Sequence, residues 1–267
     1  MVSSKLSPLW VCGIGLIIVT NQAIGADIPE LALRATARVT GGGRSGTGFF
    51  VKLPDSSPGK SSTVFVTASH ALEEITGPKG TLILRAGNEA DGYHRREVEL
   101  PLRTGEERLW MTHPTTDMAV IGVTLPDDVD VQPFELRQIA EAKHLAEKVI
   151  RVGQDVLIPC FPAQVEANPA GWPILRKGSL ATHPLTPVER VPTIFVDYSH
   201  FGGDSGAPVI ATVNDEPLVV GLVFAMLRIT DKSTTTFEDR TIHMPLGLGI
   251  AVQGPLIRQT IDAWKAK

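Results

Sequence analysis

The chain has 267 residues, of which 43% are hydrophobic and 20% charged, and its formal net charge is −4. This length suffices for one large domain or two small ones with real cores, and a mildly acidic chain without a basic stretch is not expected to bind nucleic acid. The 25 glycines and 20 prolines favour a fold with many turns, as in β-rich proteins.

The first 25 residues have the features of a cleaved export signal. Lys5 supplies a positive charge, residues 9–20 form a mostly apolar run, and small residues precede Ala26. The run is shorter than the roughly 20 residues of a membrane-spanning helix, so an uncleaved anchor is the less favoured alternative. We expect an exported protein, periplasmic or secreted, with no stable membrane span after cleavage.

Cleavage would remove Cys12 and leave Cys160 as the one cysteine of the mature chain. Such a chain can form no internal disulfide, so its stability must come from its core. Cys160 lies in the apolar run "VLIPCFPA". A buried, unreactive thiol is therefore favoured over a nucleophile.

Short β-like runs separated by Gly, Pro, Asn and Asp recur through most of the chain, and they predict an all-β fold, a sandwich or barrels. These runs are residues 35–40, 47–53, 63–68, 81–86, 118–124, 155–160, 193–197, 207–213, 218–227 and 247–252. Two segments predict helices. Residues 134–149 are rich in helix formers and could join two halves, and residues 254–267, with Pro255 in the first turn, could dock on a barrel.

Ser205 stands between glycines and beside an aspartate in "FGGDSGAPVI". A serine hydroxyl becomes a nucleophile only when a base lies within hydrogen-bond reach and an acid orients that base. His70 ends the β-run "STVFVTASHAL", and Asp117 precedes the β-run of "HPTTDMAVIGV". Strand ends are places where a rigid scaffold presents side chains to a cleft. His70, Asp117 and Ser205 are therefore the candidate base, acid and nucleophile.

The segments "VTASHAL", "TDMAVI" and "GGDSGAPVI" resemble the three signature segments of the chymotrypsin-like serine peptidases. "SGTGFFV", "GQDVLIPCFPA", "LRKGSLATHP", "LVVGLVFAM" and "GLGIAV" resemble other strands of the bacterial members. The resemblance covers most of residues 36–253. It is closest to the trypsin-like domains of the high-temperature-requirement proteases and to the glutamyl endopeptidases, and no PDZ domain is expected in this chain.

The resemblance implies two antiparallel six-stranded β-barrels and a C-terminal helix. The first barrel, residues 26–133, would carry His70 and Asp117. Residues 134–149 would form a linking helical segment. The second barrel, within residues 150–267, would carry Ser205, and the active site would lie between the barrels.

The implied function is an exported serine endopeptidase acting through an acyl-enzyme. Ser205 would attack the scissile carbonyl, His70 would take its proton, and Asp117 would orient the imidazole. The backbone N–H groups of Gly203 and Ser205 would form the oxyanion hole. A protein or peptide substrate is the expected partner, and neither a cofactor nor a metal is expected.

The resemblance also implies a primary specificity pocket. Ser199 would lie at its base next to His200, and Phe224, Ala225 and Met226 would form its wall. Without an acidic residue at the base, we expect cleavage after small or medium apolar residues and not after Arg or Lys. A protonated His200 facing the pocket would instead favour an acidic residue.

Other functions remain open. A catalytically inactive, protease-like binding protein would keep the fold without turnover. An α/β-hydrolase esterase would use the order Ser205, Asp239, His243, but that fold needs alternating strands and helices, and residues 35–130 show almost no helix. A metal site is not expected, because no pair of histidines has the ligand spacing of a helix-borne site.

Overall fold

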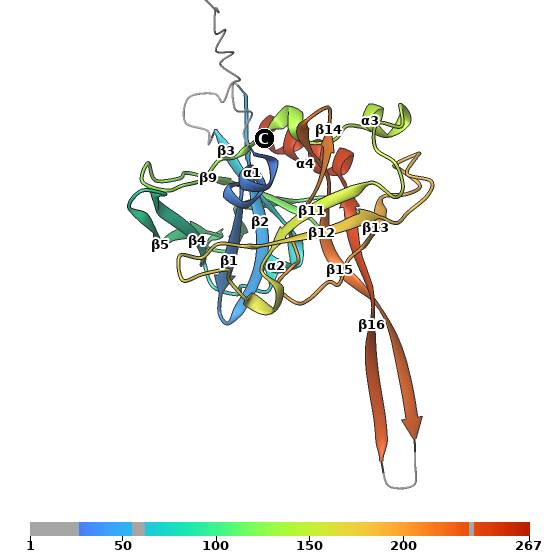
Figure 1. Cartoon of the computed structure of the whole chain (residues 1–267). Helices are drawn as coiled ribbons and strands as arrows, with labels where there is room; N and C mark the ends of the chain where they lie inside the picture. Colours follow the sequence, from blue (N-terminus) through green and yellow to red (C-terminus); the bar gives the residue numbers. More distant parts are fainter. Residues whose placement is uncertain (1–26, 55–61, 235–237) are drawn as a thin grey trace, which may run out of the picture.

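The computed structural model describes residues 27–54, 62–234 and 238–267, which form two β-rich halves and a C-terminal helix (Figure 1). The predicted export signal and Cys12 lie outside these residues. Within the described ranges, no helix is both long and apolar enough to cross a membrane.

The first half is an open, almost entirely antiparallel sheet preceded by helix α1 (Ile28–Arg34). The strand order is β5-β4-β1-β2-β3-β9-β8, and β10 pairs in parallel with β2. The strands are β1 (Thr36–Gly41), β2 (Arg44–Lys52), β3 (Thr63–Thr67), β4 (Lys79–Asn88), β5 (Gly92–Pro101), β8 (Trp110–Thr112), β9 (Ala119–Val123) and β10 (Phe134–Glu135). The short helix α2 (Ser69–Glu73) follows β3.

A closed six-stranded barrel was expected in this half, and the backbone pairing differs from it. In the described part of the chain, β5 and β8 end the sheet and do not pair with each other. The chain between them forms its own two-stranded ribbon, β6 (Arg103–Thr104) with β7 (Glu107–Arg108). The residues that could close the ring are therefore already paired locally.

The second half is a closed antiparallel barrel with the order β11-β12-β13-β16-β15-β14, as expected for one of the two barrels. Its strands are β11 (Asp155–Cys160), β12 (Ile174–Leu180), β13 (Thr193–Asp197), β14 (Pro208–Val213), β15 (Glu216–Thr234) and β16 (Asp239–Gln253). The expected C-terminal helix is confirmed as α4 (Gly254–Ala266), with a proline in its first turn.

The predicted helix over residues 134–149 is wrong as a continuous element. Phe134 pairs with Val51 in the first sheet, a 3₁₀ turn covers Leu136–Gln138, and Ile139 bridges to Val219 of the barrel. Only α3 (Ala142–Ala146) is α-helical. Pairing with both halves outweighs the helix propensity of this segment, which is a weak local preference.

Three apolar clusters stabilise the structure, and the one between the halves matters most for the site. It joins α1, β2, β3 and β9 of the first half to β14, β15, β16 and α4 of the second, with Phe49, Val120, Val252 and Ile261 fully buried. The other two clusters fill the first sheet and the barrel. The halves therefore share a core and hold a fixed relative position.

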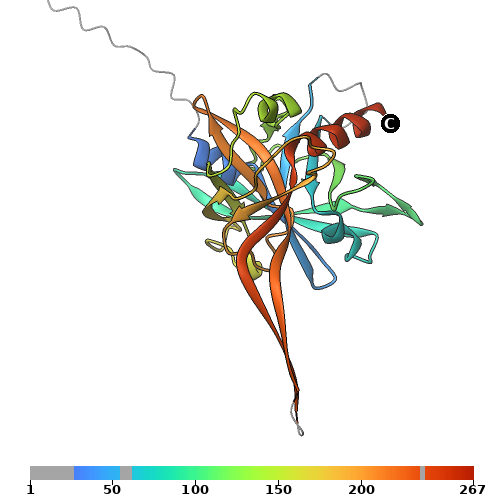
Figure 2. The same ribbon diagram turned by 90° about the vertical axis from the view of Figure 1, so that its right-hand side faces the viewer.

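Strands β15 and β16 continue beyond the barrel as a two-stranded arm, which projects away from the body in both views (Figures 1 and 2). Residues 228–234 of β15 pair there with residues 239–245 of β16. The strand predicted from the sequence covers residues 218–227, so the arm was not predicted.

Candidate active site

His70 and Asp117 are joined by two hydrogen bonds. The His70 Nδ1 to Asp117 Oδ2 distance is 2.5 Å, and the His70 backbone N–H donates to Asp117 Oδ1 at 3.0 Å. The pairing of strands β3 and β9 explains why these two residues come together. Thr67, the last residue of β3, lies opposite Ala119, the first of β9, so the residues just beyond these strand ends share one edge of the sheet.

The pair polarises the imidazole. The hydrogen bond that His70 donates to the Asp117 carboxylate raises the pKa of His70 above its ordinary value, against an opposing effect of burial. For Asp117, burial raises the pKa, but the hydrogen bonds from the His70 ring and backbone outweigh it and the pKa lies below its usual value. Asp117 is therefore an anion at neutral pH that holds the ring and stabilises its cationic form.

Ser205 lies on the turn between β13 and β14, and the first sheet fixes this turn directly. The backbone N–H of Thr47 on β2 donates to the Ser205 carbonyl at 2.8 Å, and Thr47 Oγ1 donates to the Gly203 carbonyl at 2.7 Å. Gly206 has φ +96°, and a Cβ there would meet the Thr47 carbonyl oxygen at 1.8 Å. Glycine at this position lets the turn approach β2 closely.

The same turn presents two unused backbone donors. Gly203 has φ +99°, and the Gly202 carbonyl is held by the N–H of Ala163 at 2.7 Å. In a trans peptide the N–H points opposite to the carbonyl, so this bond fixes the direction of the Gly203 N–H. In the described ranges neither Gly203 N–H nor Ser205 N–H donates a hydrogen bond. Both are available to an anionic oxygen.

Ser205 and His70 line one cavity of about 550 Å³ at the junction of the halves. The cavity is lined by Gly43, Arg44, Ser45, His70, Ala71, Glu74, Ala163, Gln164, Phe201, Gly202, Gly203 and Ser205. Ser205 Oγ donates to the Phe224 carbonyl at 3.2 Å, and no hydrogen bond joins Ser205 to His70 in the part of the chain described. Catalytic hydrogen bonds in unliganded sites are often long and shorten with substrate, so the arrangement suits a serine nucleophile and its base.

A buried polar cluster lies behind Ser205. Asp204 is fully buried, and burial raises the pKa of its carboxyl, while the Phe201 N–H and Arg176 act in the opposite sense. Arg176 Nη1 lies 3.5 Å from Asp204 Oδ2 and donates to the Ser199 carbonyl. The Arg176 guanidinium also stacks over the Tyr198 ring, at 5.1 Å from its centroid.

The five predicted pocket residues do not line the cavity that holds Ser205 and His70. Ser199 is exposed, and Phe224, Ala225 and Met226 are half-buried on β15. His200 is buried with neither ring nitrogen hydrogen-bonded. Burial, with Arg176 and His70 nearby, lowers the pKa of His200 to about 4, so the ring is neutral at pH 7.

Sequence reasoning missed two residues of this site, Thr47 and Arg176. Thr47 lies in the segment "SGTGFFV", which was read as a strand and not as a support for the nucleophile turn. Arg176 lies in the segment "LRKGSLATHP", for which only a strand was predicted. The local sequence does not predict these roles, because both depend on contacts between segments that are distant in the chain.

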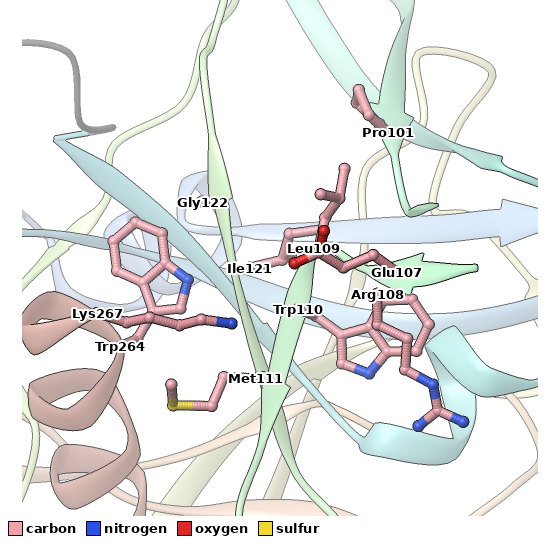
Figure 3. A pocket seen from close by; sticks show the side chains of 10 residues that line it. All are labelled: Pro101, Glu107, Arg108, Leu109, Trp110, Met111, Ile121, Gly122, Trp264 and Lys267. Atoms are coloured by element: carbon pink, nitrogen blue, oxygen red, sulfur yellow. The ribbon is translucent and has the colours of Figure 1, made fainter. Parts of the chain in front are cut away.

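A second cavity, of about 450 Å³, is lined by a different set of residues, which Figure 3 shows. Trp110 and Met111 of β8, Ile121 of β9, and Trp264 near the C-terminus contribute to its lining. It contains no pairing of a nucleophile with a base. Among the described residues there is also no group of three or more His, Cys, Asp or Glu side chains that could hold a metal ion.

No family model matches the sequence, and no curated protein matches it. The structure is similar to the crystal structure of Rv3671c from M. tuberculosis H37Rv, an inactive mutant form, with a TM-score of 0.48. The two chains share 15% sequence identity over 90% of this chain and 91% of the other. Likeness at this level supports no conclusion about function, which depends on the geometry of the site.

Proposed function

We propose that the chain is an exported serine endopeptidase of the chymotrypsin-like class. The observation that carries the proposal is that a histidine paired with an aspartate, a serine and two backbone N–H donors occur together at one site. His70, which is hydrogen-bonded to Asp117, lines one cavity together with Ser205. On the turn of the serine, the N–H groups of Gly203 and Ser205 donate no hydrogen bond within the described ranges.

The residues divide the reaction among them. Ser205 Oγ attacks the scissile carbonyl while His70 takes its proton, forming a tetrahedral oxyanion held by the N–H groups of Gly203 and Ser205. His70 then protonates the leaving amine, and an acyl-enzyme remains. A water molecule deprotonated by His70 hydrolyses the acyl-enzyme. Asp117 stabilises the imidazolium in each half-reaction.

We further propose a preference for small or medium apolar residues before the cleaved bond. Asp204, the carboxylate beside Ser205, is fully buried and lies 3.5 Å from Arg176, so it is not exposed to a substrate cation. The neutral His200 offers no charge to an acidic side chain. Apolar contacts discriminate by only about 1–3 kcal/mol per group, so the preference would be broad.

The test is hydrolysis of unfolded casein by the mature chain, followed by mass spectrometry of the products. Ser205→Ala and His70→Ala should each abolish nearly all turnover, because such residues act as a unit. Far-ultraviolet circular dichroism and the thermal midpoint control for folding. Turnover by Ser205→Ala at the wild-type rate contradicts the mechanism. A tenfold preference for Arg over Val before the cut contradicts the pocket assignment.

One observation favours the catalytically inactive alternative. In the described part of the chain, the Ser205 hydroxyl donates its hydrogen bond to the Phe224 carbonyl and not to His70. A fluorophosphonate probe decides between the two functions, because it reacts only with an activated serine. Labelling at Ser205 that His70→Ala prevents supports the peptidase, and an unlabelled wild-type chain supports the binding protein.

A further inference from the structure

Strand β15 has a free edge that begins beside Ser205. Strand β14 pairs with β15 as far as Leu222, and the residues just before β14, Gly206 and Ala207, bond to the backbone of Val223. Beyond Phe224, among the described residues, β15 pairs with β16 alone. Because Ser205 Oγ contacts the Phe224 carbonyl, this edge starts at the candidate nucleophile. It reaches the arm past two register shifts in the pairing with β16, one between Val223 and Ala225 and one between Leu227 and Arg228.

The pairing within the arm shows which backbone groups face outward. Pro245, which has no N–H, lies opposite Arg228, so this pair belongs to the type whose backbone groups point away from each other. Alternation along the strand then places the N–H and carbonyl groups of Thr230, Lys232 and Thr234 on the same outer edge.

The arm is amphipathic. Ile229 lies opposite Met244, and Ile242 lies on the same face two pairs further on, opposite Asp231. The exposed fractions are 52% for Ile229, 44% for Met244 and 37% for Ile242. The other face is polar and includes a hydrogen bond between Thr230 Oγ1 and His243 Nδ1 at 2.9 Å. A lone two-stranded ribbon is marginally stable in water, and a third strand with an apolar face stabilises it.

We propose that the β15 edge of the arm binds an extended segment of the polypeptide substrate as an added antiparallel strand. The inference rests on the proposed endopeptidase function and extends it. With Phe224 opposite the cleaved bond, residues 228–234 would contact substrate positions about four to ten residues before that bond. The substrate is thus an unfolded polypeptide with apolar side chains at alternate positions of this stretch.

The location of the β15 edge favours the substrate, and not a second copy of the chain, as the polypeptide that binds there. The opposite edge of the arm, on β16, is also unpaired beyond Leu248 in the described residues, but it leads back to β13. Only the β15 edge leads to Ser205. A polypeptide held at Ser205 would therefore continue along the β15 edge, as in other cases of β-strand addition.

The experiment compares two casein peptides that share one bond, which is a cleavage site of the digest or, if casein is not digested, a bond that follows a valine. The short peptide has three residues before the cleaved bond, and the long peptide has ten. For the wild type, kcat/KM of the long peptide should exceed that of the short one by roughly tenfold, as expected of several added main-chain hydrogen bonds. Lys232→Pro, which removes an outward N–H of β15, should bring this ratio to about one.

Thr241→Pro is the matched control. Thr241 lies directly opposite Lys232, so its outward N–H belongs to the β16 edge, and this variant should keep the wild-type ratio. An arm shortened by replacing residues 230–242 with Asn-Gly should behave as Lys232→Pro does. Equal ratios in the wild type, Lys232→Pro and the shortened arm overturn the proposal.

Binding is measured separately from turnover by fluorescence anisotropy of both peptides on Ser205→Ala. Tighter binding of the long peptide, lost in the Lys232→Pro double variant, supports the arm even if the wild type cleaves neither peptide, in which case only the proposed function fails. Sedimentation provides the remaining control. A wild-type dimer that the shortened arm converts to a monomer would show that a second copy occupies this edge, and would overturn the proposal.

Discussion

The hydroxyl group of Thr47, on β2 of the first half, donates a hydrogen bond to the carbonyl of Gly203, on the turn that carries Ser205, at 2.7 Å. The same oxygen accepts the backbone N–H of Phe161 at 3.3 Å. Thr47 is fully buried, and its one hydroxyl satisfies both the Gly203 carbonyl and the buried N–H of Phe161.

Thr47→Val should lower both stability and activity. Valine keeps the shape of threonine but leaves the Gly203 carbonyl and the Phe161 N–H without their partner, at a cost of about 1–3 kcal/mol for a buried group. Urea denaturation gives the change in the free energy of unfolding, and kcat gives the effect on the turn. Thr47→Ser, which retains the hydroxyl, should stay near the wild type. Equal behaviour of the two variants would show that the hydroxyl is dispensable.

The activity should depend on pH through His70. Because the hydrogen bond from His70 to the Asp117 carboxylate raises the pKa of His70, kcat/KM should fall with decreasing pH at a midpoint above the ordinary histidine value of about 6.5. In Asp117→Asn the midpoint should move to lower pH, and kcat should drop by roughly four orders of magnitude. An acid limb that stays in place in Asp117→Asn contradicts the assignment.

Gly206→Ala should be strongly destabilising. The added methyl group would meet the Thr47 carbonyl oxygen at 1.8 Å, and the residue has φ +96°, a conformation that alanine rarely adopts. We expect a loss of about 3–5 kcal/mol, measured by urea denaturation. Gly202→Ala is the matched control, since a Cβ there has no neighbour within 4 Å. Similar stability of the two variants would contradict the close approach of the turn to β2.

The Cys160 thiol should be unreactive in the folded chain. Its side chain is fully buried, as the sequence analysis predicted, and burial raises the pKa of the thiol well above its ordinary value. Ellman's reagent should label Cys160 only after denaturation, and dithiothreitol should change neither activity nor the thermal midpoint. Fast labelling of the native chain, or a midpoint lowered by reductant, is the contrary result.

The parts of the fold that sequence predicted are those with local causes. The glycines around Ser205 and the strand ends at His70 and Asp117 are visible in the sequence. In the structure His70 is hydrogen-bonded to Asp117, and His70 and Ser205 line one cavity, while their catalytic roles stay a prediction. The helix over residues 134–149 was wrong because pairing of Phe134 and Ile139 with other strands overrides local propensity. The arm was not predicted because Thr, Asp and Lys alternate with its few apolar residues, which is also the pattern of a loop.

The terminal helices show how the two halves are bound together. Helix α1 precedes the first sheet but also packs against β11 and β12 of the barrel, and α4 follows the barrel but also packs against β8 and β9 of the sheet. A hinge motion that widened the cleft would have to pull both helices out of the shared core. We therefore expect the cleft to keep its width from one turnover to the next. Any switch between active and resting states would then be a rearrangement confined to the turn of residues 201–206.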